Sequence, residues 1–403
     1  MNSNLDYHLT YCTNIHPGES WEQVFESLKE YVLPIKNNLC PNDPFGIGLR
    51  LSNKASIVLL KEKNLEVFKI WLENNGLYVF TINGFPYGGF HDEVVKDKVH
   101  KPDWTKTERV DYTLRLCTIL AELLPEGIDG GISTSPLSYK LWFNDNEYLL
   151  ENTFEKGTSH FLQVVDAMYQ IKLKTGKILH LDMEPEPDGL IENTAETVDF
   201  FNRWLIPMGI VYFDTVHSIP AKEAAEIIKT HFQICYDICH FAVAYENPGN
   251  VFEIFLKEGI KIGKIQISAA LKADLNKGRK AISEELSLFA ESTYLHQVIE
   301  RDMYNNLNHY TDLPMAINSI NNPDAREWRT HFHVPLFISN YGLLDSTQDE
   351  ILKVLAILKD TKITNHLEIE TYTWEVLPDK LKVGLQDSIE REIQWVIDQH
   401  NLM

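Results

Sequence analysis

A short apolar run, a loop and a segment of helical periodicity follow one another eight times along this chain of 403 residues. Such alternation is typical of parallel strands joined by crossover helices. Eight units of this kind close into a (β/α)8 barrel. We therefore predict an α/β fold whose strands are residues 7–13, 46–51, 77–82, 131–134, 178–183, 233–238, 262–268 and 366–371.

The alternative arrangement of such units is an open, doubly wound sheet. That fold usually carries a glycine-rich phosphate loop after its first strand. Residues 13–18 follow the first predicted strand here and read Thr-Asn-Ile-His-Pro-Gly, which is not such a loop. We therefore favour the closed barrel.

Local signals mark where some helices begin and end. Ser20 and Gln23 have the spacing of a capping box at the start of the first helix, which we expect to end before Pro34. Gly76 follows the helix of the second unit and suits the left-handed residue that ends many helices.

The connection between the seventh and eighth predicted strands is far longer than the others. A connection of this length is expected to have its own structure, and we predict that residues 269–328, approximately, form an insertion that covers the mouth of the barrel. Past it, His331 and His333 alternate in a short apolar run, so one ring should face inward and the other outward. The chain has no Pro/Gly/Ser-rich linker, and we interpret residues 1–403 as one domain.

Composition excludes several classes of protein. The chain has 37 Lys and Arg against 58 Asp and Glu, and its formal net charge of -21 disfavours nucleic-acid binding. It has no run of 18 apolar residues and no leader-like start, so we expect a cytoplasmic protein without membrane insertion. Five scattered cysteines predict reduced thiols, and we interpret Cys235 and Cys239 as buried ones.

The fifth predicted strand is unusually polar. His180, Asp182 and Glu184 lie on one face of it by the period-two rule, and Glu184 is at its end. In a sheet covered by helices this face is the barrel interior, where a charge needs a partner or a metal ion. We expect His180, and His366 on the eighth strand, to be hydrogen-bonded core histidines.

Three further predicted strands end in the same way. An acidic residue at one strand end more often caps a helix or pairs with a cation, but four oxygen-bearing ends in one barrel favour a metal site. These four residues are Glu184, Asp237, Gln266 and Glu370. Oxygen ligands suit Mg²⁺ or Mn²⁺, and added imidazoles admit Zn²⁺. We expect His333, with His240, to form a second metal position beside the first.

Two other segments are candidates for ligand contacts. Residues 81–91 read Thr-Ile-Asn-Gly-Phe-Pro-Tyr-Gly-Gly-Phe-His, which indicates either a loop shaped over a ligand, with Asn83 and His91 as contacts, or a packed surface loop. Thr134 at the end of the fourth strand either binds ligand hydroxyls or caps the next element.

Residues 236–240, Tyr-Asp-Ile-Cys-His, resemble the Asp-Thr-Cys-His or Asp-Thr-Phe-His metal motif of xylose-isomerase-like barrels. This group includes sugar epimerases, isomerases and endonuclease IV. The resemblance implies that Glu184, Asp237 and Glu370 are metal ligands. Gln266 stands where the group usually has histidine, which leaves the metal open among Mn, Mg and Zn.

A closer resemblance, along most of the chain, is to the EboE group, the metabolite-traffic proteins of bacterial ebo operons. The matching segments are residues 8–19, 83–88, 132–134, 184–187, 237–241, 294–297, 331–335 and 368–374. This resemblance implies a cytoplasmic role in making or moving a precursor of a specialised metabolite, with other ebo-operon proteins as candidate partners. It also leads us to expect substrate contacts from His8, Glu186 and His331.

The first functional hypothesis is a divalent-metal enzyme that isomerises or epimerises a small hydroxylated or carbonyl metabolite, with Glu184 and Glu370 as both ligands and bases. The second is a binding or carrier protein that has kept the pocket without turnover. The third is an endonuclease-IV-like phosphodiesterase, with which the net charge of -21 conflicts.

Overall fold

The computed structural model describes residues 7–89, 95–143, 146–378, 382 and 384–402. Eight parallel strands form one sheet in the order β1-β14-β7-β6-β5-β4-β3-β2. They are β1 (His8–Tyr11), β2 (Phe45–Arg50), β3 (Leu77–Asn83), β4 (Gly130–Thr134), β5 (Leu179–Met183), β6 (Phe232–Asp237), β7 (Ile262–Ile267) and β14 (His366–Ile369). Each lies within one or two residues of a predicted strand. The prediction of a (β/α)8 barrel is confirmed.

A side chain helps to close the sheet between β1 and β2. The Thr10 hydroxyl donates to the Gly46 carbonyl at 2.7 Å and accepts from the Gly48 N–H at 3.0 Å. A backbone bridge between Cys12 and Gly48 follows. Residue 48 has to be glycine, because a Cβ atom there would lie 1.9 Å from Glu368 Oε1.

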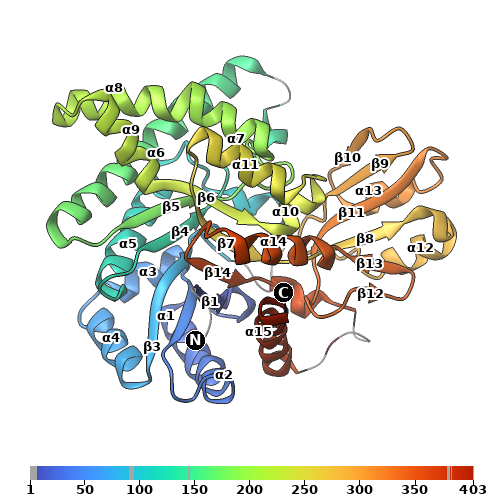
Figure 1. Cartoon of the computed structure of the whole chain (residues 1–403), viewed down its shortest axis with the longest axis horizontal. Helices are drawn as coiled ribbons and strands as arrows, with labels where there is room; N and C mark the ends of the chain where they lie inside the picture. Colours follow the sequence, from blue (N-terminus) through green and yellow to red (C-terminus); the bar gives the residue numbers. More distant parts are fainter. Residues whose placement is uncertain (1–6, 90–94, 144–145, 379–381, 383, 403) are drawn as a thin grey trace.

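Helices pack around this barrel, and all but the short, buried α10 lie on its outside (Figure 1). They are α1 (Trp21–Ser27), α2 (Leu33–Leu39), α3 (Asn53–Leu59), α4 (Asn64–Asn74), α5 (Thr107–Leu123), α6 (Glu147–Thr175), α7 (Thr194–Phe200), α8 (Ile206–His217), α9 (Ala221–His231), α10 (Ile238–Val243), α11 (Pro248–Glu258), α14 (Gln348–Asp360) and α15 (Leu385–Leu402). Among the described helices, none combines the length and the apolar composition that a membrane span requires. All five cysteines are buried and free, as expected.

The helix boundaries agree with the sequence signals in part. Ser20 and Gln23 form the predicted capping box of α1, and Gly76, with φ of 62°, follows α4. The expected end before Pro34 is wrong. A π-helical turn, Leu28–Val32, carries the chain directly into α2, with Pro34 in its first turn. A helix start tolerates proline, whose missing N–H is not needed there.

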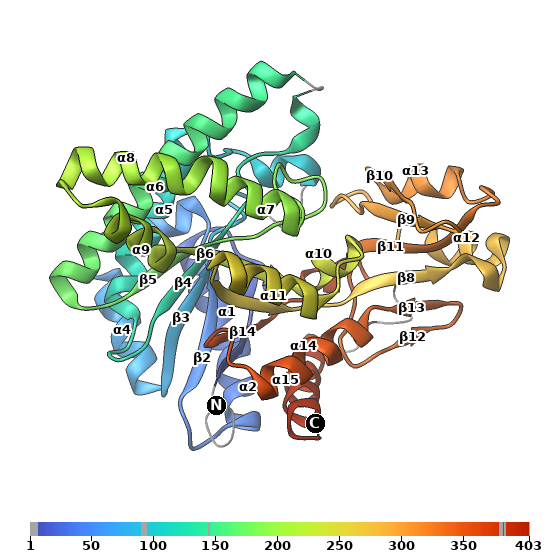
Figure 2. The ribbon, with the colours of Figure 1, turned by 45° about the horizontal axis from the view of Figure 1, so that its top comes forward.

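The long connection between β7 and β14 forms a second, antiparallel sheet of six strands in the order β10-β9-β11-β8-β13-β12. The strands are β8 (Ala270–Asp274), β9 (Val298–Asp302), β10 (Leu307–Tyr310), β11 (Ala325–His333), β12 (Asn340–Tyr341) and β13 (Leu344–Ser346), and the helices α12 (Arg279–Leu286) and α13 (Leu313–Asn318) pack with them. This sheet projects from one side of the barrel (Figure 2). The strands of this second sheet run from residue 270 to residue 346. The insertion therefore extends past residue 328, where we expected it to end.

The barrel interior contains a buried ion pair. Lys264 Nζ lies 2.5 Å from Glu368 Oε2, both side chains are fully buried, and Lys264 also donates to the Ser133 hydroxyl at 3.1 Å. Burial by itself would lower the pKa of Lys264, but the charge of Glu368 reverses this and raises it well above its ordinary value. Lys264 is therefore a fixed positive charge in the middle of the barrel.

A second buried carboxylate fastens the C-terminal helix. Glu392 of α15 accepts hydrogen bonds from the Leu336 N–H at 3.1 Å and the Thr371 hydroxyl at 2.9 Å. It thereby ties α15 both to the segment after β11 and to the end of β14. Burial raises the pKa of Glu392 to about 7, although these hydrogen bonds act in the opposite direction.

We predict that Glu392→Gln makes the stability of the protein less dependent on pH. The ordinary pKa is 4.5 and the folded-state value is about 7, so the folded chain holds an extra proton between them. Stabilisation by this group is therefore complete below the lower value and is lost as the pH rises through the upper one. The loss is on the order of 3 kcal/mol, at 1.36 kcal/mol per pKa unit. Urea unfolding from about pH 4.5 to about pH 8 measures it. A difference between wild type and variant that stays constant with pH would contradict the prediction.

Candidate functional site

Three carboxylates meet at the C-terminal ends of the barrel strands. Glu184 follows β5, Asp237 ends β6 and Glu370 follows β14. One oxygen of each lies within 4.8 Å of one oxygen of the other two, and all three side chains are buried. Parallel strands bring their C-terminal ends to the same rim, which is why residues so distant in sequence converge.

Asp237 also belongs to a second group, with His240 and His333, whose ligand atoms again lie within 4.8 Å of one another. Asp237 Oδ1 accepts from the His240 N–H at 3.0 Å, as the N-cap of α10, and from the Ser268 hydroxyl at 2.7 Å. Its Oδ2 is buried without a hydrogen bond to any described residue. Asp237 is therefore placed to bridge two ligand groups, one of carboxylates and one with imidazoles.

Backbone carbonyls fix the tautomers of two histidines. His333 Nδ1 donates to the Glu370 carbonyl at 3.0 Å, and His240 Nδ1 donates to the Pro185 carbonyl at 3.0 Å. Each Nε2 is thus left with its lone pair. Burial lowers the pKa of His333 to about 4 and also lowers that of His240. Both rings are neutral at pH 7, the state that metal coordination requires.

His331 adds a third imidazole. Gln297 donates to the Pro187 carbonyl at 3.1 Å, so its oxygen faces His331 Nδ1 at 2.9 Å and makes that nitrogen the donor. His331 Nε2 then directs a lone pair at His240 Nε2, 3.1 Å away. Two facing lone pairs repel each other unless a cation lies beside both. Glu186 has a carboxylate oxygen within 4.8 Å of one ring nitrogen of each of these histidines.

His331 and His333 face the same side, so the expectation that one would point outward is wrong. The ring centroids are 5.6 Å apart, and both rings lie near His240. The cause is a shift in register in β11, where Thr330 pairs with Leu271 but His333 pairs with Ala270. A bulge of this kind breaks the alternation of side chains.

The electrostatics of the site fit a bound divalent cation. Burial, together with the charges of Glu370 and Asp237, raises the pKa of Glu184 well above its ordinary value. Burial and the charge of Asp237 raise the pKa of Glu370 to about 8. Glu184 Oε2 and His333 Nε2 are buried without a hydrogen bond to any described residue. Oxygen and imidazole ligands of this kind suit Mn²⁺, Mg²⁺ or Zn²⁺.

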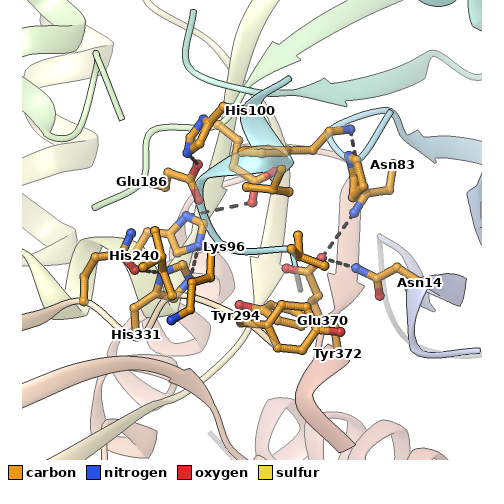
Figure 3. Close-up of a pocket in the computed structure, with 17 residues that line it drawn as sticks. Asn14, Asn83, Lys96, His100, Glu186, His240, Tyr294, His331, Glu370 and Tyr372 are labelled. Atoms are coloured by element: carbon orange, nitrogen blue, oxygen red, sulfur yellow. Dashed lines mark hydrogen bonds and ion pairs between the residues drawn. The ribbon is translucent and has the colours of Figure 1, made fainter. Parts of the chain in front are cut away.

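A cavity of about 70 Å³ opens on these residues. Figure 3 shows His240 and His331 on one side and Glu370 with Asn14 and Asn83 on the other. Asn14 donates to Glu370 Oε1 at 2.8 Å and Asn83 donates to the same atom at 3.2 Å. The described lining consists of Asn14, Asn83, Phe85, Pro86, Val95, Lys96, Val99, His100, Glu184, Glu186, His240, Tyr294, Leu295, Gln297, His331, Glu370 and Tyr372.

Five of the expected site residues are not among the described lining residues of this cavity: Asp237 and His333, which belong to the ligand groups above, and Gln266, Thr134 and His8. Gln266 lies beside Asp237 in the barrel, but its amide oxygen accepts from Cys235 Sγ at 3.3 Å. The Thr134 hydroxyl accepts from the indole of Trp104 at 3.0 Å. His8 is the first residue of β1 and pairs with His366, so it lies at the opposite end of the barrel. His91 lies outside the described residues.

Several lining residues were not predicted individually. His100 Nε2 lies 3.1 Å from Glu186 Oε1, and no motif pointed to it. Asn14, Tyr294, Gln297 and Tyr372 lie inside segments that match the EboE group. The signal for these four was therefore in the resemblance, although the spacing of the residues gave no role for them.

No family model matches the chain, and no curated protein matches its sequence. Its structure is similar to a D-psicose 3-epimerase solved in the presence of D-fructose, with a TM-score of 0.50 and 10% identity over 98% of each chain. It is also similar to a putative sugar phosphate isomerase/epimerase from Anabaena variabilis ATCC 29413, with a TM-score of 0.51 and 10% identity over 98% of this chain and 99% of that one. These similarities show that the chain shares the (β/α)8 barrel fold of both proteins.

Proposed function

We propose that this protein is a divalent-metal-dependent enzyme that isomerises or epimerises a small polar metabolite. The observation that carries the proposal is that Asp237 belongs to two sets of possible metal ligands. One set contains Glu184 and Glu370, and the other contains His240 and His333. Such a donor set at the C-terminal rim of a barrel is arranged for metal-assisted chemistry. Structural similarity to a D-psicose 3-epimerase and to a putative sugar phosphate isomerase/epimerase supports the choice of reaction.

A bound divalent ion polarises hydroxyl and carbonyl oxygens and so acidifies the adjacent C–H bond. The chain itself supplies the groups that move the proton. Asn14 and Asn83 hold Glu370 Oε1, which fixes the orientation of that carboxylate. Glu184 Oε2 has no hydrogen bond to a described residue. We assign Glu184 and Glu370 as the groups that remove and return the proton.

The cavity favours a short, uncharged substrate. Its volume of about 70 Å³ is small beside the roughly 300–1,000 Å³ of pockets for drug-sized ligands. Glu184, Glu186 and Glu370 make the lining acidic, and Lys96 is already paired with Asp312 at 2.7 Å. Among the described lining residues, no lysine or arginine other than Lys96 is present to pair with a phosphate group. We therefore propose a small unphosphorylated ketose or a related hydroxycarbonyl compound.

The pathway is proposed from the sequence resemblance. The segments that match the EboE group supply several residues of the cavity, among them Asn14, Asn83, Gln297 and Tyr372. We propose that the protein acts in the cytoplasm on a precursor of a specialised metabolite, with other ebo-operon proteins as partners.

The metal assignment predicts that Asp237→Asn weakens both ligand groups. Asparagine keeps the oxygen that caps His240 and accepts from Ser268, so the change removes a charge with little effect on folding. Mn²⁺ affinity, measured by calorimetry, should fall by at least ~10- to 100-fold. His333→Ala should weaken only the second group and leave one Mn²⁺ bound.

Asp111→Asn is the matched control. Asp111 is exposed on α5, and its substitution makes the same chemical change away from the site. If Asp237→Asn binds Mn²⁺ as tightly as this control does, Asp237 is not a metal ligand. Unchanged metal content in His333→Ala would leave a site with a single ion.

The assignment of the proton-transferring groups predicts solvent exchange. In D2O, metal-loaded protein should incorporate deuterium next to the carbonyl of D-fructose or another small ketose, which NMR detects. Glu184→Gln should slow this exchange by ~10²- to 10⁴-fold, the usual contribution of a general base. Glu126→Gln, at an exposed position, is the control. A protein that binds these ketoses but exchanges no proton would instead be a carrier.

A further inference from the structure

A second cluster of ligand-type side chains lies at the opposite end of the barrel. Asp129 immediately precedes β4, His180 is the second residue of β5, and His366 is the first residue of β14. One ligand atom of each lies within 4.8 Å of those of the other two. The cluster shares no residue with the pocket described above.

His180 is oriented as metal-bound histidines usually are. Its Nδ1 donates to Asp182 Oδ1 at 2.6 Å, so in the neutral ring the opposite nitrogen, Nε2, carries the lone pair. Burial opposes protonation, but the charges of Asp182 and Asp129 raise the pKa of His180, so a metal ion at Nε2 competes with a proton. That nitrogen is buried and forms no hydrogen bond with a described residue. A carboxylate behind the ring fixes the tautomer and strengthens the ring as a ligand. Asp182 is fully buried and holds the imidazole in this position.

His366 has no hydrogen bond from either ring nitrogen to the described residues, although the ring is fully buried. It stacks on His180, with centroids 5.3 Å apart and planes at 26°. A buried polar nitrogen without a partner costs free energy, and in native proteins it calls for an explanation such as an ion. Both histidines are buried in the core as expected; His180 is hydrogen-bonded to Asp182, and the polar neighbour of His366 is Asp129, 3.5 Å from its Nε2.

Asp129 lies between the two rings. Its carboxylate is 3.5 Å from His366 Nε2 and 3.8 Å from His180 Nε2, and Asn365 donates to it at 3.1 Å. The two distances to nitrogen are longer than the usual hydrogen-bond range of roughly 2.7–3.2 Å. Ligands around one ion at bonds of about 2.0–2.2 Å lie ~3–3.5 Å apart. The distance from Asp129 to His366 is at the upper end of this range and the distance to His180 exceeds it, so binding of an ion would draw Asp129 toward the two rings.

Asp129 is the member of the cluster that reaches solvent, whereas His180 and His366 are fully buried and are not among the described lining residues of the adjacent cavity. Asp129, Gly263 and Asn365 line a cavity of about 640 Å³ between the ends of the strands and helices α11 and α14. A Cβ atom at position 263 would lie 2.0 Å from Asp182 Oδ1 and 2.6 Å from His180 Nδ1. The absence of a side chain there makes room for the Asp182 and His180 pair at the wall of the cavity.

We propose that Asp129, His180 and His366 form a separate binding site for a divalent transition-metal ion, which would enter from this cavity past Asp129. Two imidazoles and one carboxylate suit Zn²⁺ or Fe²⁺. The ion joins β14 to β5 and to the start of β4, and β14 is separated from β5 by β7 and β6. It therefore links strands on opposite sides of the barrel and raises the thermal stability of the loaded protein.

Calorimetric titration with Zn²⁺ tests this site when the other one is disabled. The full-length Asp237→Asn protein should still bind one Zn²⁺. Adding Asp129→Asn should weaken that binding by ~10- to 100-fold, whereas adding Asp111→Asn should not. Asp129 is partly exposed, with 31% of its side-chain surface accessible, so the variant is expected to fold. Equal Zn²⁺ binding by the two double variants overturns the proposal.

A second measurement does not depend on a variant. In a crystal of the unaltered protein soaked in Zn²⁺, anomalous scattering should show a peak between Asp129, His180 and His366. Peaks confined to the other end of the barrel would mean that the cluster is only a network of ion pairs, and the proposal would be overturned. Neither measurement depends on enzymatic activity, so the proposal of this second metal site can be judged apart from the proposed function.

Discussion

Lys264 is the buried positive charge on which the interior of the barrel depends. Its ammonium pairs with Glu368 at 2.5 Å. Burial and the neighbouring carboxylates raise the pKa of Glu184 and of Glu370, and the charge of Lys264 offsets only part of that rise. Breaking such a pair leaves an uncompensated buried charge, which costs several kcal/mol, about 3–5 in measured cases. One lysine cannot offset all the carboxylates that surround it. The excess of negative charge at the C-terminal rim is the physical reason to expect a cation there.

The strands and the acidic residues at the strand ends could be predicted because both follow from local rules. Apolar runs separated by helical segments determine the barrel, and the period of two puts Asp182 and Glu184 in its interior. Asp237 and Glu370 then meet Glu184 because parallel strands share one rim. No long-range contact had to be known for this part of the candidate site.

The imidazoles could not be placed in this way. His331 and His333 face the same side only because β11 has a bulge, and the bulge depends on pairing with β8 in the tertiary structure. Gln266 has the expected position on its strand but interacts with Cys235, a neighbour across the sheet. By its sequence pattern, His366 belongs to an apolar strand. It lies near Asp129 only because the barrel closes. Each of these depends on partners distant in sequence.

These differences have a common consequence for the metal site. The xylose-isomerase-like resemblance leads one to expect histidine on β7, where this chain has Gln266. Here the imidazoles come instead from α10, through His240, and from β11, through His331 and His333. His333 is held against the barrel by its hydrogen bond to the Glu370 carbonyl. The insertion is therefore part of the proposed metal site, and the barrel alone lacks two of its three imidazoles. Changes in the second sheet that alter the bulge of β11 would move these ligands without altering any barrel strand.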